Sequence, residues 1–150
     1  MAYREKPYSQ FNFLVDIGGP AADEPSGGFQ EVSGLGLEIN VAEYRAGNKK
    51  DNAPDKIPGS YTVPDVTLKR GVMGDDALYS WLDDVRNGSF EAPRTVTIQL
   101  LSEDRQTVAS VWKLINAFPS TYTGPELSGA GTDVAVEELV LACESIAMEF

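Results

Sequence analysis

This 150-residue sequence contains several short segments in which every second side chain is apolar. In residues 10–17, for example, Phe11, Phe13 and Val15 are spaced in this way. A two-residue period places successive side chains on opposite faces of a β-strand, whereas a helix requires a period of about 3.6 residues. The pattern therefore limits the fold to one made mainly of strands, which we expect at residues 10–17, 29–32, 37–44, 65–72, 94–101 and 107–118.

One segment, residues 75–87, has a helical period instead. Its apolar side chains follow the spacing i, i+3, i+4 and i+7, and they are Leu78, Trp81, Leu82 and Val85. Asp75 is suited to cap the start of this helix, and Asn87-Gly88 to close its end. The acidic pairs 75–76 and 83–84 are interpreted as capping and solvating the helix, because neither has the spacing of a calcium loop.

Turn-rich stretches separate the expected strands. Residues 18–28 are rich in Gly, Pro, Ser and acids, which favour a loop. Residues 33–36 indicate a hairpin or a bulge, and residues 102–106 indicate the turn of a hairpin between two strands. Residues 45–60 are polar and long for an internal connection, so we predict that this loop contacts a partner.

The C-terminal segment, residues 134–150, fits two patterns. Its Ala, Glu and Leu residues favour a helix, and Ala135, Leu139 and Ile146 fit helical spacing. A two-residue period with a phase break at the pair of glutamates, 137–138, fits as well. Periodicity alone leaves this choice open. With the segment counted as strand, the sequence predicts about seven strands and one helix.

Composition places the chain among ordinary globular domains. Its length suits one domain spanning residues 1–150, with 42% hydrophobic and 23% charged residues. No apolar stretch is long enough to cross a bilayer, and the first ten residues lack the apolar core of a signal peptide. With a single cysteine no internal disulfide forms, so we expect a soluble product of the cytoplasm without stable membrane insertion.

Two features argue against nucleic-acid binding and against most enzymes. The net charge of −11, from 12 Lys and Arg against 23 Asp and Glu, disfavours contact with a phosphate backbone. Histidine is absent, which removes the usual general base near neutral pH and the commonest metal ligand. We therefore expect no catalytic residue, no metal and no cofactor. An enzyme that uses carboxylates alone is the remaining enzymatic alternative.

Several motifs that carry chemistry in other proteins are interpreted as structural here. The sequences Gly34-Leu35-Gly36 and Gly129-Ala130-Gly131 lack the third glycine of a dinucleotide fingerprint and are typical of turns. Trp81 and Trp112 stand at apolar spacing, which favours packing in a core or an interface. Cys143 has apolar neighbours and no partner for redox chemistry, so we interpret it as a small buried hydrophobe.

Taken together, the segments resemble, in their order, the inner tube proteins of contractile phage tails and extracellular contractile injection systems. The resemblance covers nearly the whole chain. It is carried by the segments FNFLVDI (11–17), FQEVSGLGLEI (29–39), EYRAG (43–47), IPGSY (57–61), VTLKRGV (66–72), the helix with Trp81, VTIQLL (96–101), VWKLINAFPSTYTGPEL (111–127) and VEELVLACES (136–145). Two departures are the length of the 18–28 loop and Cys143, where the family usually has a histidine.

The resemblance implies a mainly β (α+β) fold, a small antiparallel β-barrel or sandwich with one flanking helix, whose sheets are completed across subunits. It also implies that the C-terminal segment is a strand, although local propensity favours a helix. Members of the family form hexameric rings that stack into a hollow tube. Sheath, baseplate and tube-cap proteins are the implied partners, with cargo or DNA passing through the bore. Assembly in the bacterial cytoplasm into a virion tail or an injection particle follows from the same resemblance.

Self-assembly also follows from the physics of sheet edges. Unpaired edges that join neighbouring subunits close a ring, and head-to-tail stacking extends it into a filament. We predict that the 45–60 loop and its borders make these contacts, with candidate residues Tyr44, Arg45, Lys49, Lys50, Asp55, Lys56 and Pro58. One sheet face packs under the helix, and the other lines a polar bore whose acidic excess repels anionic cargo.

Two further interpretations remain open at the level of sequence. A monomeric ligand-binding β-barrel would have the same strand pattern and would enclose an apolar pocket. A related baseplate or terminator component of the same machine would have nearly the same sequence features as a tube subunit.

Overall fold

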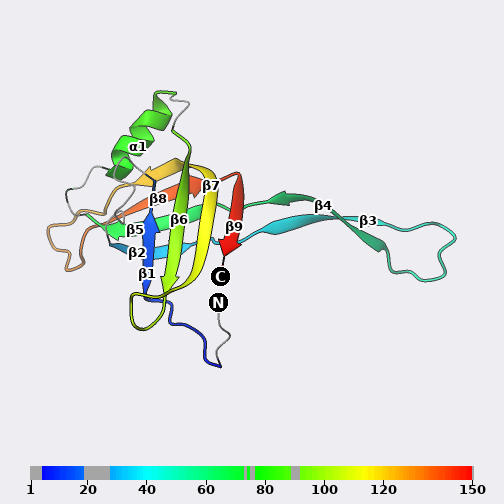
Figure 1. Ribbon diagram of the computed structural model, residues 1–150. Helices are drawn as coiled ribbons and strands as arrows, with labels where there is room; N and C mark the ends of the chain where they lie inside the picture. Colours follow the sequence, from blue (N-terminus) through cyan, green and yellow to red (C-terminus); the bar gives the residue numbers. More distant parts are fainter. Residues whose placement is uncertain (1–4, 19–27, 73, 75–76, 89–91, 150) are drawn as a thin grey trace.

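The structure is a computed structural model that describes residues 5–18, 28–72, 74, 77–88 and 92–149. Within those residues the chain forms nine β-strands and one α-helix (Figure 1), where the sequence predicted about seven strands and one helix. In chain order the elements are β1 (Phe13–Asp16), β2 (Phe29–Ser33), β3 (Glu38–Tyr44), β4 (Asp55–Thr62), β5 (Val66–Gly71), α1 (Ala77–Arg86), β6 (Arg94–Leu101), β7 (Val108–Thr123), β8 (Val136–Ala142) and β9 (Ser145–Glu149).

Seven strands form one hydrogen-bonded sheet that folds into two layers. Six of them follow the path β1-β6-β7-β8-β5-β2, the seventh, β9, pairs with β7, and every pair is antiparallel. In Figure 1 the strands β1, β6 and β9 cross the strands β2, β5 and β8, while β7 belongs to both layers. The path stays open between β1 and β2, so the body is a mainly β sandwich and not a closed barrel.

Strand β7 joins the layers because it is 16 residues long and changes partners along its length. Residues 111–115 pair with β9, and residues 118–123 pair with β8. Between them Asn116 has a φ of 52°, in the left-handed region that asparagine tolerates better than most side chains. Its Nδ2 donates a hydrogen bond of 2.9 Å to Glu144, which lies between β8 and β9. Asn116 therefore marks the corner at which β7 passes from one layer to the other.

The hydrophobic core lies between the two layers, with α1 at one end. Alternate residues of the strands enter it, namely Val15, Val66, Leu68, Val96, Ile98, Leu114, Ala117, Leu139 and Leu141. Leu78 and Trp81 of α1 join this cluster. The Trp81 indole N–H donates to the backbone oxygen of Ala92 over 2.7 Å, so the fully buried ring has no unpaired polar atom. The predicted packing role of Trp81 is confirmed.

A buried ion pair interrupts the apolar core. Arg70 and Glu137 are register partners on β5 and β8, with only 3% and 6% of their surfaces exposed. Arg70 Nε donates to Glu137 Oε1 over 2.7 Å, and the Tyr122 hydroxyl donates to Glu137 Oε2 over 2.7 Å. The hydrogen bond to Glu137, together with burial, raises the pKa of Tyr122 above its usual value. Three side chains from three adjacent strands thus satisfy one another inside the sandwich.

The helix is confirmed over Ala77–Arg86. Residues 75–76 of the predicted range, with the proposed cap Asp75, lie outside the described residues. At the far end Gly88 has a φ of 78° and donates its backbone N–H to Val85, so Asn87-Gly88 closes the helix as predicted. Among the described residues, no helix is long and apolar enough to span a membrane.

Two local predictions are wrong. Residues 33–36 do not turn β2 back onto β3, because β2 pairs with β5 and β3 pairs with β4. Residues 45–60 do not form one continuous loop, because β4 begins at Asp55. Pro58 and Gly59 concealed this strand, since both are unfavourable inside a sheet. A strand with only one neighbour leaves its other edge free of hydrogen bonds, and proline is tolerated there.

The C-terminal segment is a pair of strands, β8 and β9, so the strand interpretation is confirmed over the helical one. The break in the alternation lies at Cys143 and Glu144 and not at the glutamates 137–138. Glu137 is itself a core-facing residue of β8, so the two-residue period continues through it. Pairing with β5 and β7 outweighs the helical propensity of this segment.

We expect Arg70→Met to lower the free energy of unfolding by about 3–5 kcal/mol, because it leaves the Glu137 carboxylate buried without its cation. Replacing both residues, in Arg70→Met/Glu137→Leu, should recover most of that loss. Lys69→Met is the matched control: Lys69 pairs with Glu31 at 3.7 Å on the surface, and its loss should cost less than about 1 kcal/mol. Urea denaturation measures all three. Equal losses in Arg70→Met and Lys69→Met would contradict the account of the ion pair.

At the corner of β7, we expect Asn116→Gly to retain the stability of the parent chain and Asn116→Val to lose about 1–2 kcal/mol, because a β-branched side chain is strained at positive φ. Both variants lose the hydrogen bond to Glu144, so their difference isolates the backbone conformation. Thermal unfolding of the two variants side by side provides the comparison, and equal midpoints would show that the corner carries no such strain.

Candidate assembly interface

Strands β3 and β4 form a hairpin that projects from the two-layered body (Figure 1). Every residue of both strands is exposed, and in the described structure the two strands pair only with each other. An isolated two-stranded hairpin is at best marginally stable in water. The projecting hairpin therefore needs a surface to pack against.

Gly34 allows the chain to leave the body for the hairpin. Its φ is +90°, and a Cβ at this position would lie 2.2 Å from the backbone oxygen of Asp65. Only glycine combines this conformation with such a close approach of two backbones. The glycine at position 34 therefore has a structural role in the backbone, as expected from the sequence, although residues 34–36 do not form a hairpin turn.

The pairing register divides the hairpin into two faces. Ile39 is opposite Tyr61 and Val41 is opposite Pro58, and residues paired across two strands point to the same side. These four residues form what we call the apolar hairpin face. Val41 is 55% exposed and Tyr61 is 53% exposed, which is unusual for large hydrophobic side chains so close together.

The opposite face of the hairpin is mixed. Near the body it is polar, where Asn40 Nδ2 donates to Ser60 Oγ over 3.1 Å and lies 3.5 Å from Thr62 Oγ1. Toward the tip it carries Tyr44 and Ile57, both more than half exposed. Apolar side chains are therefore exposed on both sides of the hairpin.

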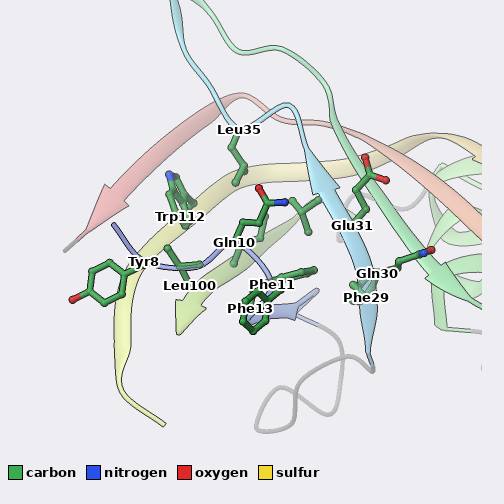
Figure 2. Close-up of a pocket in the computed structure, with 12 residues that line it drawn as sticks. Tyr8, Gln10, Phe11, Phe13, Phe29, Gln30, Glu31, Leu35, Leu100 and Trp112 are labelled. Atoms are coloured by element: carbon green, nitrogen blue, oxygen red, sulfur yellow. The ribbon is translucent and has the colours of Figure 1, made fainter. Parts of the chain in front are cut away.

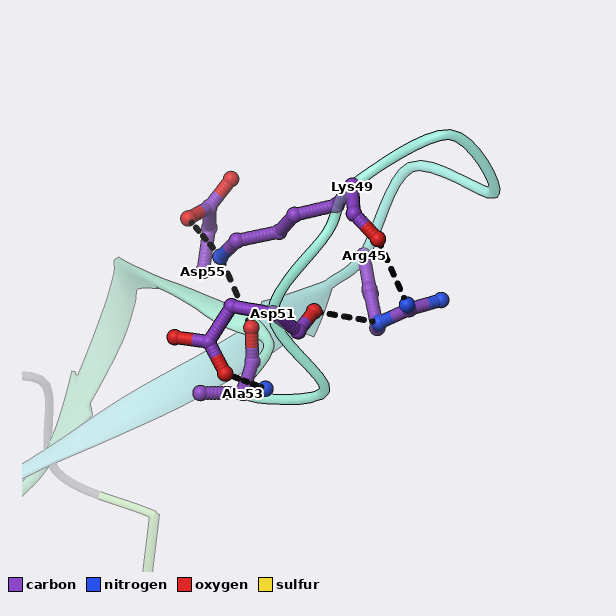
Figure 3. Close-up of polar contacts among 5 residues, drawn as sticks. All are labelled: Arg45, Lys49, Asp51, Ala53 and Asp55. Carbon is purple, nitrogen blue, oxygen red and sulfur yellow. Dashed lines mark hydrogen bonds and ion pairs between the residues drawn. The ribbon is translucent and has the colours of Figure 1, made fainter.

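The hairpin tip, residues 45–54, is held in shape by its own polar contacts (Figure 3). Arg45 donates to the backbone oxygens of Lys49 and Asp51 over 2.9 and 3.0 Å. Lys49 Nζ donates to the backbone oxygen of Ala53 over 2.7 Å and to Asp55 Oδ1 over 2.9 Å. These contacts order the tip, so its shape does not depend on an apolar core.

The structure gives the seven predicted assembly residues different roles. The side chains of Arg45, Lys49 and Asp55 form hydrogen bonds within the end of the hairpin. The side chains of Lys50 and Lys56 are exposed, and Lys56 lies opposite Glu43 in the hairpin. Tyr44 and Pro58 are exposed on opposite faces of the hairpin, so all seven residues lie on this one element. Their role in assembly remains a prediction.

The hairpin differs in charge from the rest of the molecule. Residues 45–56 contain four of the 12 Lys and Arg but only two of the 23 Asp and Glu, a net charge of +2 in a chain whose total is −11. The tip is therefore basic on an acidic chain, and its charge suits an acidic partner surface.

A second apolar surface lies where the path of strands is open, between β1 and β2. Figure 2 shows side chains from both strands, and from β6 and β7, around one cavity of about 780 Å³. We call it the aromatic groove. Its lining includes the rings of Phe11, Phe13, Phe29 and Trp112 together with Leu35 and Leu100, and also the polar residues Tyr8, Gln10, Gln30 and Glu31. Phe11 is 67% exposed, so the groove opens to the surface.

Sequence reasoning missed the most informative residues of this region. The two-residue period predicts a strand for Ile39 and Val41, but it does not tell whether the apolar side of that strand enters the core of the same chain. Ile57 lies in residues 45–60, for which the sequence predicts a loop, and Tyr61 follows directly after them. Two residues in the sequence indicate β4. Ile57 and Tyr61 both favour strands, and they stand among polar residues.

Trp112 and Cys143, which the sequence predicts to be packing residues, both contact the hydrophobic core. Trp112 packs against the core and also lines the aromatic groove. Cys143 is half-buried against the core, and burial raises the pKa of its thiol. In the part of the chain that the structure describes, no three His, Cys, Asp or Glu side chains gather into a group that could hold a metal ion.

Comparison with known structures gives several close matches over nearly the whole chain. A chain in the extended sheath-tube complex of the PVC extracellular contractile injection system is 29% identical, with a TM-score of 0.84 over 97% of this chain and 93% of that one. A chain in the sheath/tube terminator of the same system is 30% identical, with a TM-score of 0.84 over 97% and 99%. The tube-terminating cap of the anti-feeding prophage is 27% identical, with a TM-score of 0.85 over 99% and 95%.

Among curated proteins, no sequence matches this chain. The family model described as T4-like virus tail tube protein gp19 matches residues 9–147, which include the hairpin, the aromatic groove from Gln10 onward and all nine strands except the last two residues of β9. The chain therefore belongs to the T4-like tail tube protein family.

Proposed function

We propose that this chain is a non-enzymatic structural subunit of the inner tube of a contractile injection system or contractile phage tail. Hexameric rings of the subunit stack into a tube, and cargo or DNA passes through its channel without specific binding. The observation that carries the proposal is the exposed apolar hairpin β3–β4 in a chain of the tail tube family.

The hairpin supports assembly because its exposed side chains gain free energy only when something covers them. Burying one side chain of the size of Val, Ile or Phe contributes about 1.5–3 kcal/mol. Ile39, Val41, Ile57 and Tyr61 are each about half exposed, so a second copy that covers them recovers much of this free energy. A solitary chain leaves the hairpin in water.

The two apolar sides of the hairpin support contacts with more than one neighbour. One side carries Ile39, Val41 and Tyr61, and the other carries Tyr44 and Ile57. A hairpin held between two copies connects subunits in two directions, around a ring and along a stack. Head-to-tail contacts of this kind form closed rings or open filaments according to the rotation between copies.

Strand edges provide the second kind of contact. In the described path β1 pairs only with β6 and β2 pairs only with β5, so each has one edge without a strand partner. Such edges template pairing with another chain. Joining them between copies completes the sheets across subunits and removes the exposed edges from the assembled ring.

The partner proteins of the tube are proposed from the relatives of this chain. A relative of this chain occurs in a sheath-tube complex, and others in a terminator and a cap. By analogy, sheath, baseplate and tube-cap proteins are the partners of this chain, which assembles in the bacterial cytoplasm as part of a virion tail or injection particle. Sheath contraction supplies the work, and the subunit contributes stiffness and a channel.

A terminator or cap subunit is the second candidate, because the terminator and cap chains match this fold as well as the sheath-tube chain does. The two roles differ in what the purified protein builds. A tube subunit polymerises into stacks of rings, whereas a terminator stops at one ring that binds the end of a tube.

We expect purified wild-type protein to form rings or tubes in negative-stain micrographs, and Val41→Glu to stay dispersed with an unchanged unfolding midpoint. Val41 is exposed on the hairpin, so a carboxylate there costs little in the isolated chain and much inside an interface. Val134→Glu is the matched control, because Val134 is 79% exposed and lies outside the hairpin. A wild-type protein that is monomeric at every concentration, or a Val41→Glu variant that assembles normally, would contradict the proposal.

We also expect the bore of the assembled tube to carry negative potential, because the chain has a net charge of −11 and the bore must not hold anionic cargo. The electrostatic surface of a reconstructed tube tests this expectation. A strongly positive bore would refute it and would indicate a channel that binds its cargo.

A further inference from the structure

We infer that the aromatic groove of one copy is the docking site for the apolar hairpin face of a second copy. This inference rests on the proposed function and adds to it the receptor surface of the hairpin. Two observations carry it: a groove lined by aromatic rings and several polar side chains lies at the open seam of the sandwich, and an exposed apolar hairpin face lies on the same chain.

The groove is open in a way that suits a strand more than a small molecule. Ligand pockets bury most of the ligand surface and place a few polar groups at its polar atoms. Here Phe11 stands at the surface, and the groove follows the gap between the ends of a strand path. Among the described strands, β1 and β2 each have one edge without a partner beside the groove, and such edges bind extended segments of other chains.

The occupant must come from another copy, because the hairpin of the same chain points away. In Figure 1 the hairpin leaves the body and extends outward from it. Leu35, which lines the groove, precedes β3 by three residues, so the groove begins at the base of the chain's own hairpin and the hairpin runs on from there. A second copy is therefore the source of any hairpin in the groove.

Chemistry on the two sides is complementary. The hairpin face offers Ile39, Val41 and Tyr61, and the groove offers aromatic rings at its floor and mouth. Glu31 also lines the groove, 3.7 Å from Lys69, and Lys56 follows the apolar face toward the tip, opposite Glu43. Apolar contact with charged side chains at its border is the usual anatomy of a protein interface.

The hairpin and the groove are different surfaces, so each copy offers one hairpin and one groove and both donates and receives. Such a contact closes into a ring or repeats along a stack when each copy serves two different neighbours, and it closes into a symmetric dimer when two copies exchange hairpins. The size of the assembled particle separates these arrangements, and a reciprocal dimer would contradict the tube.

The test uses photo-cross-linking from the hairpin. Tyr61 is replaced by the photoreactive residue benzoylphenylalanine in the full chain, and the particles are irradiated and analysed by mass spectrometry. We expect cross-links between position 61 of one copy and peptides containing residues 8–13 or 29–35 of another, with mixed isotope labelling to prove that they join two chains. Tyr79 of α1, 49% exposed against 53% for Tyr61, is the matched control site and should not label the groove.

A groove variant gives an independent readout. Phe11→Glu places a charge at the mouth of the groove on a residue that is mostly exposed, so the isolated chain should fold normally. We expect it to raise the protein concentration needed for assembly at least about tenfold, which corresponds to losing one buried aromatic side chain. Tyr79→Glu should leave that concentration unchanged.

The outcomes separate the inference from the proposed function. Rings or tubes whose cross-links from position 61 map to other segments, together with normal assembly of Phe11→Glu, would overturn the docking site and leave the tube intact. A chain that remains monomeric and gives no cross-link between copies would overturn both.

Discussion

The body of this molecule depends on one long strand. Strand β7 pairs with β6 and β9 in one layer and with β8 in the other, so both layers share a single piece of backbone. The change of partner occurs at Asn116, whose left-handed conformation turns the strand, and the layers then enclose the core from two directions. Sandwiches with crossed layers need such a corner. Without it the alternating segments would form a flat sheet with one side in water.

When the two layers enclose the core in this way, two apolar surfaces remain exposed in the described part of the chain. The strand path ends at β1 and β2 with the aromatic groove between them, and β3 and β4 extend away as an exposed hairpin. A protein that worked alone would gain stability by folding the hairpin into the groove. With the hairpin and the groove apart, each copy exposes two surfaces that another copy is able to cover. Under the proposed docking, a basic hairpin tip on an acidic chain adds electrostatic attraction between copies.

Much of the fold follows from the two-residue period, because strands β5, β6 and β8 bury alternate residues as the sequence indicates. The two-residue period does not predict burial where contacts with distant segments determine which side chains are covered. Glu137 occupies a core position because Arg70 and Tyr122 reach it from neighbouring strands, and no local pattern reveals such partners. Ile39 and Val41 show the opposite case: they have the spacing of core residues but lie on the surface of the isolated chain. The candidate interface was thus located by its polar loop, while its apolar part required the structure.

The central claim is that another copy of the chain covers the hairpin β3–β4. A cryo-EM reconstruction of the assembled particle measures this most directly, through the solvent-accessible area of Ile39, Val41 and Tyr61 in the assembly. The account predicts that these three side chains, about half exposed in the single chain, become buried against a neighbouring subunit. A reconstruction in which the hairpin projects into solvent, with subunits joined through other surfaces, would contradict it.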